Sequence, residues 1–371
     1  MRDNLINKKL KLKFFDSTNL RQKSIEDSIL RTGPERVSIF LNNSCNFNCV
    51  TCWDYSPLLK KQRSKKWMAT KIKKELVFHL LDELVNLGCV GVIFTGYGEP
   101  LLHPNINSFI KRAKKNYMSV GITTNLSSVK DPCELADCLT LPMDSIFVHL
   151  SAATPKTYVR MHPNQSKKDF YKILNNIKIL VSRLVSVKLI YIVTKLNYKE
   201  IPKMIKLNKD LKTKLHFELM DFHLNSGLNK ISLEKKSKKE IITYFSGLRM
   251  QEKFRAENNI KDFLDQLIYS GLGFKKLERC CIGYFWSVIN ELGHVYYCCD
   301  SKKNFFMGDL NKKSFKDIWF SQRYQQFRTR FLEGKFLKDC QQCINGKGTN
   351  FKTRAYINPE IRNFDAEKAA F

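Results

Sequence analysis

The chain has 371 residues, 43% of them hydrophobic and 12% aromatic, which is enough apolar surface for one large globular domain or a large and a small one. No apolar run is long enough to cross a bilayer and no apolar segment follows the first charges, so we expect a soluble, cytoplasmic protein without a membrane partner. Twelve cysteines in such a chain argue against a disulfide framework and favour metal ligands.

The formal net charge is +29, which is compatible with a polyanionic partner such as RNA. The lysines are spread along the whole chain and are not gathered into one arm. This distribution is typical of a solvated surface in a protein from an AT-biased genome. Nucleic acid is therefore retained as an alternative partner and is not the favoured one.

Residues 1–35 are polar and basic, with a short helix predicted around 24–30 and a break at Gly33 and Pro34. From Glu35 the chain alternates apolar, strand-like runs with amphipathic helical stretches, a pattern typical of a parallel sheet with crossover helices. The six predicted strands are 37–41, 90–95, 119–123, 145–150, 187–193 and 215–220.

Three cysteines follow the first predicted strand with the spacing Cys-x3-Cys-x2-Cys, at Cys45, Cys49 and Cys52. Three thiolates so close in sequence repel one another unless a soft cation lies between them. Tetrahedral zinc needs a fourth ligand nearby, whereas an iron-sulfur cluster is held by three thiolates with one iron left open. The spacing favours the cluster, with a zinc knuckle or three unrelated cysteines as the alternatives.

At these residues the chain resembles the radical S-adenosylmethionine (SAM) enzymes. The resemblance implies a [4Fe-4S] cluster on Cys45, Cys49 and Cys52 that binds SAM and cleaves it to a 5'-deoxyadenosyl radical, which abstracts hydrogen from a substrate. It also implies an α/β fold with a partial (β/α)6 TIM-like barrel, whose active site lies at the carboxyl ends of the strands. A reductant protein such as flavodoxin or ferredoxin is the implied electron source.

The turn after the second predicted strand contains Gly96, Tyr97, Gly98 and Glu99. Glycines let the backbone approach a ligand closely, and a carboxylate suits an ammonium group. The stretch is similar to the family's Gly-Gly-Glu motif, which implies that these four residues bind the amino group of SAM. A tight strand-to-helix turn is the structural alternative.

Three further residues match positions that contact SAM in the family: Asn125 after the third predicted strand, Ser151 after the fourth, and Arg160 in the helix that follows. The resemblance implies that Ser151 meets the ribose and Arg160 the carboxylate of SAM. Strand alternation places His149 and Ser151 on one face of the fourth strand, which is predicted to line the barrel. The structural alternatives are support of a loop for Asn125, an exposed position at a helix end for Arg160 and a buried core position for His149.

After residue 225 the pattern becomes helical and polar, with helices predicted at 241–248 and 260–269, followed by a β-hairpin around Gly293. The cysteines that return here are similar in layout to the SPASM and twitch domains, which hold auxiliary clusters. The implied ligands of one auxiliary [4Fe-4S] cluster are Cys281, Cys298, Cys340 and Cys343, with Cys280 and Cys299 as alternates. A zinc ribbon on the same four residues is the alternative.

These patterns divide the chain into a lead (1–35), a partial barrel (36–225), a helical connector (226–277), an auxiliary-cluster domain (278–345) and a tail (346–371). A fully ligated auxiliary cluster would accept an electron, which favours net oxidation of a small polar metabolite such as a sugar or aminocyclitol. Peptide side-chain modification, RNA or nucleotide modification and a non-enzymatic zinc-binding adaptor are the alternatives. No catalytic base is identified from the sequence.

Overall fold

The structure is a computed structural model that describes residues 16–220, 227–248, 258–269, 279–298, 303–337 and 340. Cys299, Cys343 and the predicted tail at 346–371 lie outside these residues.

Within the described ranges the strands form one open sheet of nine, in the order β6-β5-β4-β3-β2-β1-β7-β8-β9. The first six pair in parallel with their neighbours, as the sequence predicts for a partial barrel, and the sheet does not close. They are β1 (Arg36–Phe40), β2 (Gly91–Thr95), β3 (Ser119–Thr124), β4 (Ser145–His149), β5 (Ser186–Val193) and β6 (Lys214–Leu219).

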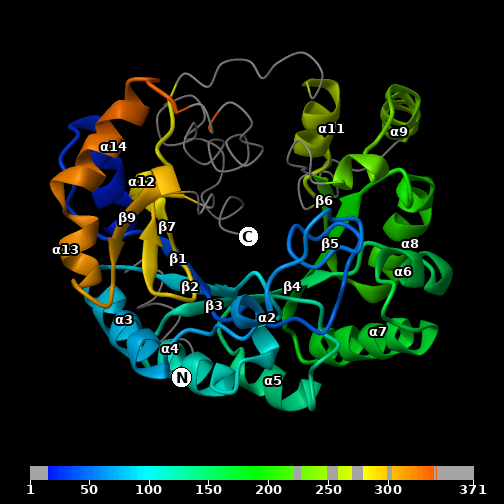
Figure 1. The fold of residues 1–371 in the computed structure, drawn as a ribbon, viewed down its shortest axis with the longest axis horizontal. Coiled ribbons are helices and arrows are strands. Elements are labelled where there is room, and N and C mark those ends of the chain that lie inside the picture. The colour runs from blue at the N-terminus through cyan, green and yellow to red at the C-terminus, as the bar shows by residue number, and fades with distance from the viewer. Residues whose placement is uncertain are drawn as a thin grey trace.

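Helices connect these strands, and α3 to α8 lie along the outer side of the curved sheet (Figure 1). A right-handed crossover is the usual way to join parallel strands, so the helices gather on one side. No helix of the described chain is long and apolar enough to span a membrane. The helices are α2 (Lys65–Met68), α3 (Lys74–Asn86), α4 (Ile106–Lys115), α5 (Pro132–Cys138), α6 (Pro155–Met161), α7 (Lys167–Ser182) and α8 (Ile201–Leu211).

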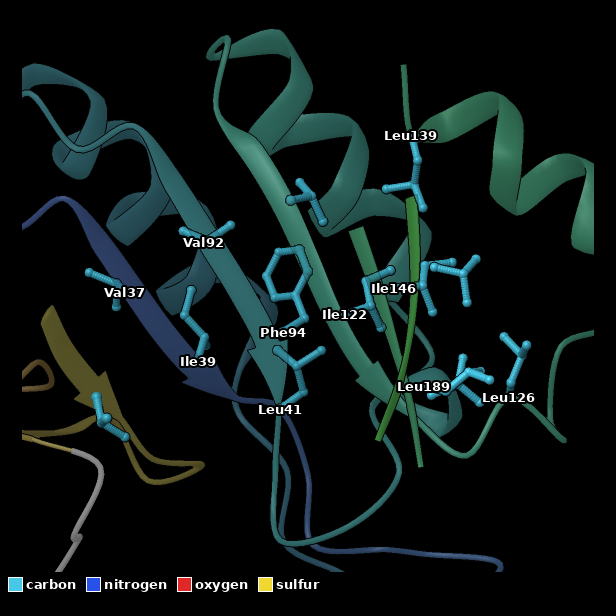
Figure 2. Close-up of a cluster of buried hydrophobic side chains, with 14 of the residues drawn as sticks. Val37, Ile39, Leu41, Val92, Phe94, Ile122, Leu126, Leu139, Ile146 and Leu189 are labelled. Carbon is cyan, nitrogen blue, oxygen red and sulfur yellow. The ribbon is translucent and has the colours of Figure 1, made fainter. Parts of the chain in front are cut away.

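The main core lies between this sheet and the outer helices (Figure 2). Strand residues that face the helices are wholly buried, such as Val37, Phe94 and Ile146. Their sequence neighbours on the other face, such as Ile93 and Phe147, are only partly buried. Because successive side chains of a strand point to opposite faces, these residues line the concave face, which the described residues cover less completely.

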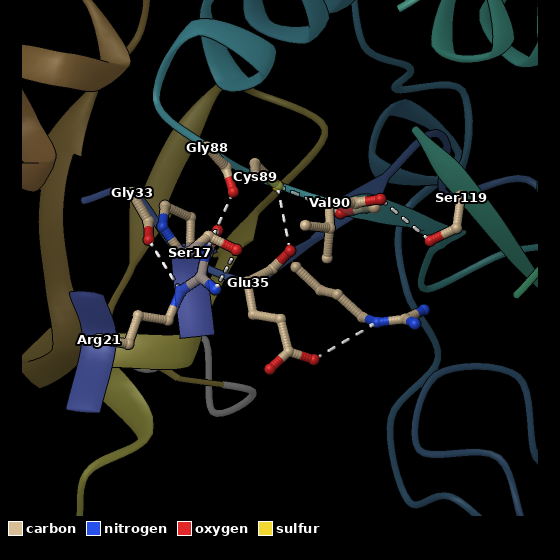
Figure 3. A network of polar contacts seen from close by, with 11 residues as sticks. Ser17, Arg21, Gly33, Glu35, Gly88, Cys89, Val90 and Ser119 are labelled. Atoms are coloured by element: carbon tan, nitrogen blue, oxygen red, sulfur yellow. Dashed lines mark hydrogen bonds and ion pairs between the residues drawn. The ribbon is translucent and has the colours of Figure 1, made fainter. Parts of the chain in front are cut away.

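The predicted helix at 24–30 is wrong in position, since residues 16–26 are helical and the helix ends there. The Ser24 hydroxyl accepts a hydrogen bond from the Arg31 backbone at 3.0 Å, which turns the chain back after the helix. Arg21 anchors the helix to the barrel, because its guanidinium donates to the carbonyls of Gly33, Pro34 and Gly88 (Figure 3).

The C-terminal part confirms the helix predicted at 260–269, as α11 (Ile260–Tyr269), and the hairpin, as β7 (Trp286–Ile289) and β8 (His294–Tyr296). The helix predicted at 241–248 is present as α9 (Lys235–Gly247), which begins six residues before the predicted start. β7 pairs in parallel with β1, so the hairpin extends the barrel sheet, a pairing that the sequence does not indicate. The remaining elements are α12 (Ile282–Phe285), β9 (Phe306–Asp309), α13 (Phe315–Trp319) and α14 (Gln322–Leu332).

The outer edge of β6 is covered by two asparagine side chains. Asn258 accepts from the backbone of Leu215 at 2.6 Å, and Asn259 both accepts from and donates to the backbone of Phe217, at 2.8 and 2.9 Å. These amides satisfy backbone groups that a seventh barrel strand would otherwise pair, and so the sheet ends at β6.

Candidate active site

The cysteine triplet lies in the loop after β1, at the carboxyl edge of the parallel strands. The Cys45 thiol accepts a hydrogen bond from the Phe47 backbone at 3.4 Å. The Cys52 thiol accepts from the backbones of Asp54 and Tyr55, at 3.4 and 3.3 Å. Backbone N–H groups directed at sulfur favour thiolates, which is the form that ligates metal.

The three thiols interact with one another. Burial, together with the charges of Glu99 and Cys52, raises the pKa of Cys45 to about 12. Burial also raises the pKa of Cys49, followed by the charges of Cys52 and Cys45. Thiolates here therefore need a cation. In the described part of the chain no three His, Cys, Asp or Glu side chains converge on the position of a single ion. Three cysteine thiols are the donor set of a cluster with one open iron, whereas a structural zinc site takes four protein ligands, so the donor set fits a cluster.

His162, which directly follows α6, contacts the triplet. Its Nδ1 lies 3.1 Å from the Cys49 sulfur and its Nε2 lies 3.1 Å from the carbonyl oxygen of Leu150. Burial lowers the pKa of His162 to about 4. The sequence analysis missed this residue, because it is 113 positions from Cys49 and only the fold brings the two together.

The glycine-rich turn after β2 is hydrogen-bonded to the chain just before the triplet. The Gly98 backbone donates to Asn42 at 3.1 Å, and the Glu99 backbone donates to Ser44 at 2.8 Å. A Cβ on Gly98 would lie 2.1 Å from the Ser44 carbonyl oxygen, and one on Gly96 would lie 2.7 Å from that of Asn42. Only glycine allows this approach, so the predicted SAM turn and the triplet form one unit.

The Glu99 carboxylate is buried and holds two loops together. It accepts from the Thr124 hydroxyl at 2.6 Å, from the Asn125 backbone at 2.7 Å and from the Leu101 backbone at 3.1 Å. Burial raises its pKa to about 6, against the effect of these donors. The structure thus gives Glu99 a role in joining the loops after β2 and β3. Its predicted contact with the SAM ammonium remains a prediction.

The Asn125 side chain extends this connection to the triplet loop. Its amide donates to the Asn46 side chain at 2.9 Å, and its oxygen accepts from the backbone and hydroxyl of Ser127 at 2.9 and 2.8 Å. Asn46 in turn donates to the Ser127 hydroxyl at 2.7 Å. Asn46 lies between the first two cysteines, so the loops after β1, β2 and β3 are joined in one polar network.

Tyr97, between the two glycines, packs in an aromatic group beside the triplet loop. Its ring lies edge-on to Phe40, with ring centroids 4.9 Å apart, and 5.7 Å from the ring of Trp67. The Arg63 guanidinium covers the Trp67 ring at 4.9 Å. This packing places the Tyr97 ring against the end of β1.

Ser151 and Arg160 occupy different surroundings. Ser151 is buried just after β4 with a φ of +48°, and its hydroxyl accepts from the Ile192 backbone at 3.1 Å. Its carbonyl accepts from the Asn197 side chain at 2.9 Å. Arg160 is exposed on α6 and donates to the Leu196 carbonyl. The structure therefore joins Ser151 to the loop after β5 and leaves Arg160 at the surface.

The concave face of β4 to β6 carries a group of ionisable side chains that the sequence analysis did not identify as a site. The Glu218 carboxylate lies 3.5 Å from His216 Nε2, both on β6. His149 is in register with His216 through Ile190 of the strand between them. Lys188 is two residues before Ile190 on β5, and its ammonium group lies 5.4 Å from the centroid of the Phe147 ring.

Burial moves the pKa values of this group toward the neutral forms. It raises the pKa of Glu218 to about 7, which the charge of Lys188 opposes. Burial lowers the pKa of His149 to about 4, and burial together with the charges of Lys188 and His149 lowers that of His216 to about 4. The available sequence signal was the alternation of polar residues Lys214, His216 and Glu218 along β6.

The second cysteine group begins directly before α12, with Cys280 and Cys281. Cys281 is wholly buried, and burial raises its pKa to about 12. The Cys280 backbone donates to Phe331 of α14 at 3.0 Å, and Cys298 follows β8. A Cβ on Gly283 would lie 2.3 Å from the ring of Tyr297, so only glycine allows the ring to pack against α12. None of the ten described cysteines forms a disulfide.

Two family models match the chain. The radical SAM superfamily model covers residues 39–207, and the model of an iron-sulfur cluster-binding domain, SPASM, covers residues 280–344. The chain belongs to the radical SAM superfamily. As a radical SAM enzyme it uses a [4Fe-4S] cluster and SAM, and its SPASM domain implies auxiliary iron-sulfur binding, so the predicted cofactors are confirmed. The zinc-binding adaptor is set aside, because the chain is an enzyme.

Several relatives are similar to this radical SAM enzyme over much of its length. A probable GTP 3',8-cyclase of Saccharolobus islandicus is 27% identical over 228 residues, which cover 60% of this chain and 68% of the relative. A tungsten-containing aldehyde ferredoxin oxidoreductase cofactor-modifying protein of Pyrococcus furiosus is 23% identical over 333 residues, 82% of this chain and 85% of the relative.

Two solved structures share the fold. Native anSMEcpe with bound AdoMet has a TM-score of 0.60 at 15% identity, over 89% of this chain and 99% of the other. SuiB of Streptococcus suis bound to S-adenosylmethionine has a TM-score of 0.60 at 14% identity, over 89% of this chain and 76% of the other. At these identities the likeness concerns the fold alone.

Proposed function

We propose that this enzyme oxidises a carbon that bears a hydroxyl group in a small polar substrate, held on the concave face beside Glu218. When bound, the first cluster and SAM supply the radical that removes a hydrogen atom from the substrate. Cys45, Cys49 and Cys52 would hold that cluster, and the backbone of Gly96 to Gly98 would hold SAM.

The chain's own part in this oxidation is to accept a proton. Conversion of C–OH to C=O removes one hydrogen atom, one electron and one proton. The bound SAM would take up the hydrogen atom and the auxiliary iron-sulfur cluster would take up the electron, so the proton would pass to a side chain of this chain. A proton acceptor must lie near the carboxyl ends of the strands, where the triplet lies.

The Glu218–His216 pair is the observation that carries the proposal. Glu218 is the next-to-last residue of β6, near the carboxyl edge of the sheet, and its side chain is 44% exposed. Its pKa of about 7 makes a carboxylate basic enough to take a hydroxyl proton near neutral pH. His216, with its pKa lowered to about 4, stays neutral and is suited to hydrogen-bond the same hydroxyl.

A substrate panel tests the proposal. The reconstituted enzyme would be reduced with dithionite and given SAM with each of glucose, glucosamine, myo-inositol, an aminocyclitol, GTP and a short peptide. We expect a carbonyl product from a sugar or cyclitol, with one 5'-deoxyadenosine released for each product. Turnover of GTP or of the peptide alone would contradict the proposed substrate class and favour the nucleotide or peptide alternatives, which the names of the relatives also suggest.

The Glu218→Gln variant tests the assigned proton acceptor. Loss of general-base catalysis lowers rates by about 10²- to 10⁴-fold, so product formation should fall by that factor. In the unchanged enzyme the rate should rise with pH as Glu218 ionises around pH 7, and this dependence should disappear in the variant. Glu234→Gln, at an exposed position before α9, is the matched control. Full product formation by Glu218→Gln would refute the assignment.

A further inference from the structure

Arg328 in α14 is a fully buried cation without an acidic partner among the described residues. Its relative exposure is 0%, and no carboxylate of the described chain forms an ion pair with it. Its Nε donates to the Gly283 carbonyl at 2.8 Å and its Nη2 to the Trp319 carbonyl at 2.9 Å. Its Nη1 is buried with no hydrogen-bond partner.

Aromatic rings enclose the guanidinium. It lies 4.2 Å from the ring centroid of Tyr324, 4.4 Å from that of Trp319 and 5.6 Å from that of Tyr284. Such rings attract a cation weakly compared with the cost of removing it from water. A buried charge of this kind is usually compensated by a negative charge nearby, which the described residues do not supply.

The cysteines of the SPASM domain lie around the same rings. Gly283, which accepts from Arg328, is two residues after Cys281. Cys281 packs in one buried cluster with Tyr284, whose ring Arg328 covers, and the Cys280 backbone donates to the Phe331 carbonyl at 3.0 Å. Burial raises the pKa of Tyr324, the charge of Arg328 lowers it and the charge of Cys298 raises it. The ring of Tyr297, which directly precedes Cys298, lies 5.3 Å from that of Tyr324 and 5.1 Å from that of Phe331, so the cysteines and Arg328 lie around the same group of aromatic rings.

We propose that Arg328 is the counter-charge of the auxiliary iron-sulfur cluster and raises its reduction potential. Four thiolates give an oxidised [4Fe-4S] cluster about two negative charges, and one-electron reduction adds another. A fixed positive charge in a region of low dielectric stabilises the reduced form more than the oxidised form. Arg328 thereby makes the cluster a better acceptor for the electron that remains after hydrogen abstraction. The transfer of an electron from the substrate to the cluster rests on the proposed function, whereas the effect of Arg328 on the reduction potential does not.

The reduction potential of the auxiliary cluster tests the inference without a substrate. In a chain with Cys45, Cys49 and Cys52 changed to Ala, the auxiliary cluster is the remaining cluster, and its potential can be followed by EPR during a mediated dithionite titration. Arg328→Met should lower the equilibrium constant for reduction at least tenfold, which is about 59 mV for one electron. Arg328→Lys, which keeps the positive charge, should lower the reduction potential less than Arg328→Met does.

Arg330→Met is the matched control, because Arg330 is exposed on the same helix and carries the same charge. We expect this control to change the equilibrium constant less than twofold. An unchanged potential in Arg328→Met, or equal shifts in the two variants, would overturn the inference. If the potential shifts while no substrate of the panel is oxidised, the proposed function fails and the role of Arg328 stands.

A second measurement applies even if Arg328→Met does not load iron. Without the cluster, Arg328 is an uncompensated buried charge, so its removal should leave the melting temperature of the iron-free chain unchanged or higher. With the cluster, the unchanged chain should gain more thermal stability on loading than the variant does. A large loss of melting temperature in the iron-free variant would show that Arg328 is a packing residue and would refute its role as a counter-charge.

Discussion

The two cysteine regions have buried charges of opposite sign beside them. The triplet lies near Glu99, whose charge adds to the effect of burial in raising the pKa values of Cys45 and Cys49. In the SPASM region, Arg328 donates to the carbonyl of Gly283, two residues after Cys281. A nearby anion opposes the addition of an electron to a cluster, whereas a nearby cation favours it. If the inference about Arg328 holds, we expect the first cluster to have the more negative reduction potential.

The two regions also differ in how the protein holds them. The triplet loop is joined by hydrogen bonds to the loops after β2 and β3, through Gly98, Glu99 and Asn125. The described SPASM cysteines lie among packed aromatic rings, such as those of Tyr297, Tyr324 and Phe331. The first region is thus organised by the barrel, and we expect the second to depend more strongly on its metal.

Removal of the triplet ligands should have the largest effect. We expect the native chain to bind about eight irons and the variant with Cys45, Cys49 and Cys52 changed to Ala to bind about four. The variant should release no 5'-deoxyadenosine above background after dithionite reduction. Iron analysis and chromatography of the nucleoside products check both points. Loss of all iron in the variant would mean that the two regions are not independent.

Removal of iron by a chelator should separate the two regions. Because a metal site contributes folding energy, backbone protection in β8, β9 and α14 should fall by about 10³-fold. The barrel strands β2 to β5 should keep their protection, since their core contains no ligand. Hydrogen exchange with mass spectrometry measures both at once. An equal loss of hydrogen-exchange protection in the barrel strands would contradict the expectation that the SPASM region depends more strongly on its metal.

Gly98→Ala tests how closely the barrel organises the first region. The new Cβ would lie 2.1 Å from the Ser44 backbone oxygen, so the turn must move away from the triplet loop. A displacement of about 1 Å near reacting groups can cost about 10²-fold, and SAM cleavage should fall by that order. Gly247→Ala is the matched control, because its Cβ would meet nothing within 4 Å. Equal activity of the two variants would show that the turn is free to adjust.

The buried carboxyl group of Glu99 should have a smaller effect, a dependence of the free energy of unfolding on pH. The pKa of Glu99 is raised from 4.5 to about 6, so the stability due to its protonated form is present below about pH 4.5 and is lost as pH rises through about 6. The loss amounts to about 2 kcal/mol. Urea unfolding of the iron-free chain should show this loss, and Glu99→Gln should lack it. In the loaded enzyme, the same variant should raise the potential of the first cluster.

The local sequence determined much of this protein. Apolar periodicity predicted the six barrel strands within one or two residues, the hairpin and the helices α9 and α11, because these patterns depend on near neighbours. The spacing of Cys45, Cys49 and Cys52 indicated the cluster, since a ligand set close in sequence needs little of the fold. The helix predicted at 24–30 was misplaced, because the side-chain bonds of Arg21 and Ser24 decide where it ends.

Only the tertiary structure decided which distant residues meet. The parallel pairing of β7 with β1 depends on sheet order, which periodicity does not encode. The contact of His162 with Cys49 also depends on the fold, because the two residues are far apart in the sequence. The Glu218–His216 pair becomes a candidate site only because the fold places this face of β6 on the concave side of the sheet. Arg328 looked like any helix arginine, and burial against Trp319 and Tyr324 made it distinct. Charges, unlike strands, take their meaning from long-range surroundings, because burial and neighbouring groups set their energies.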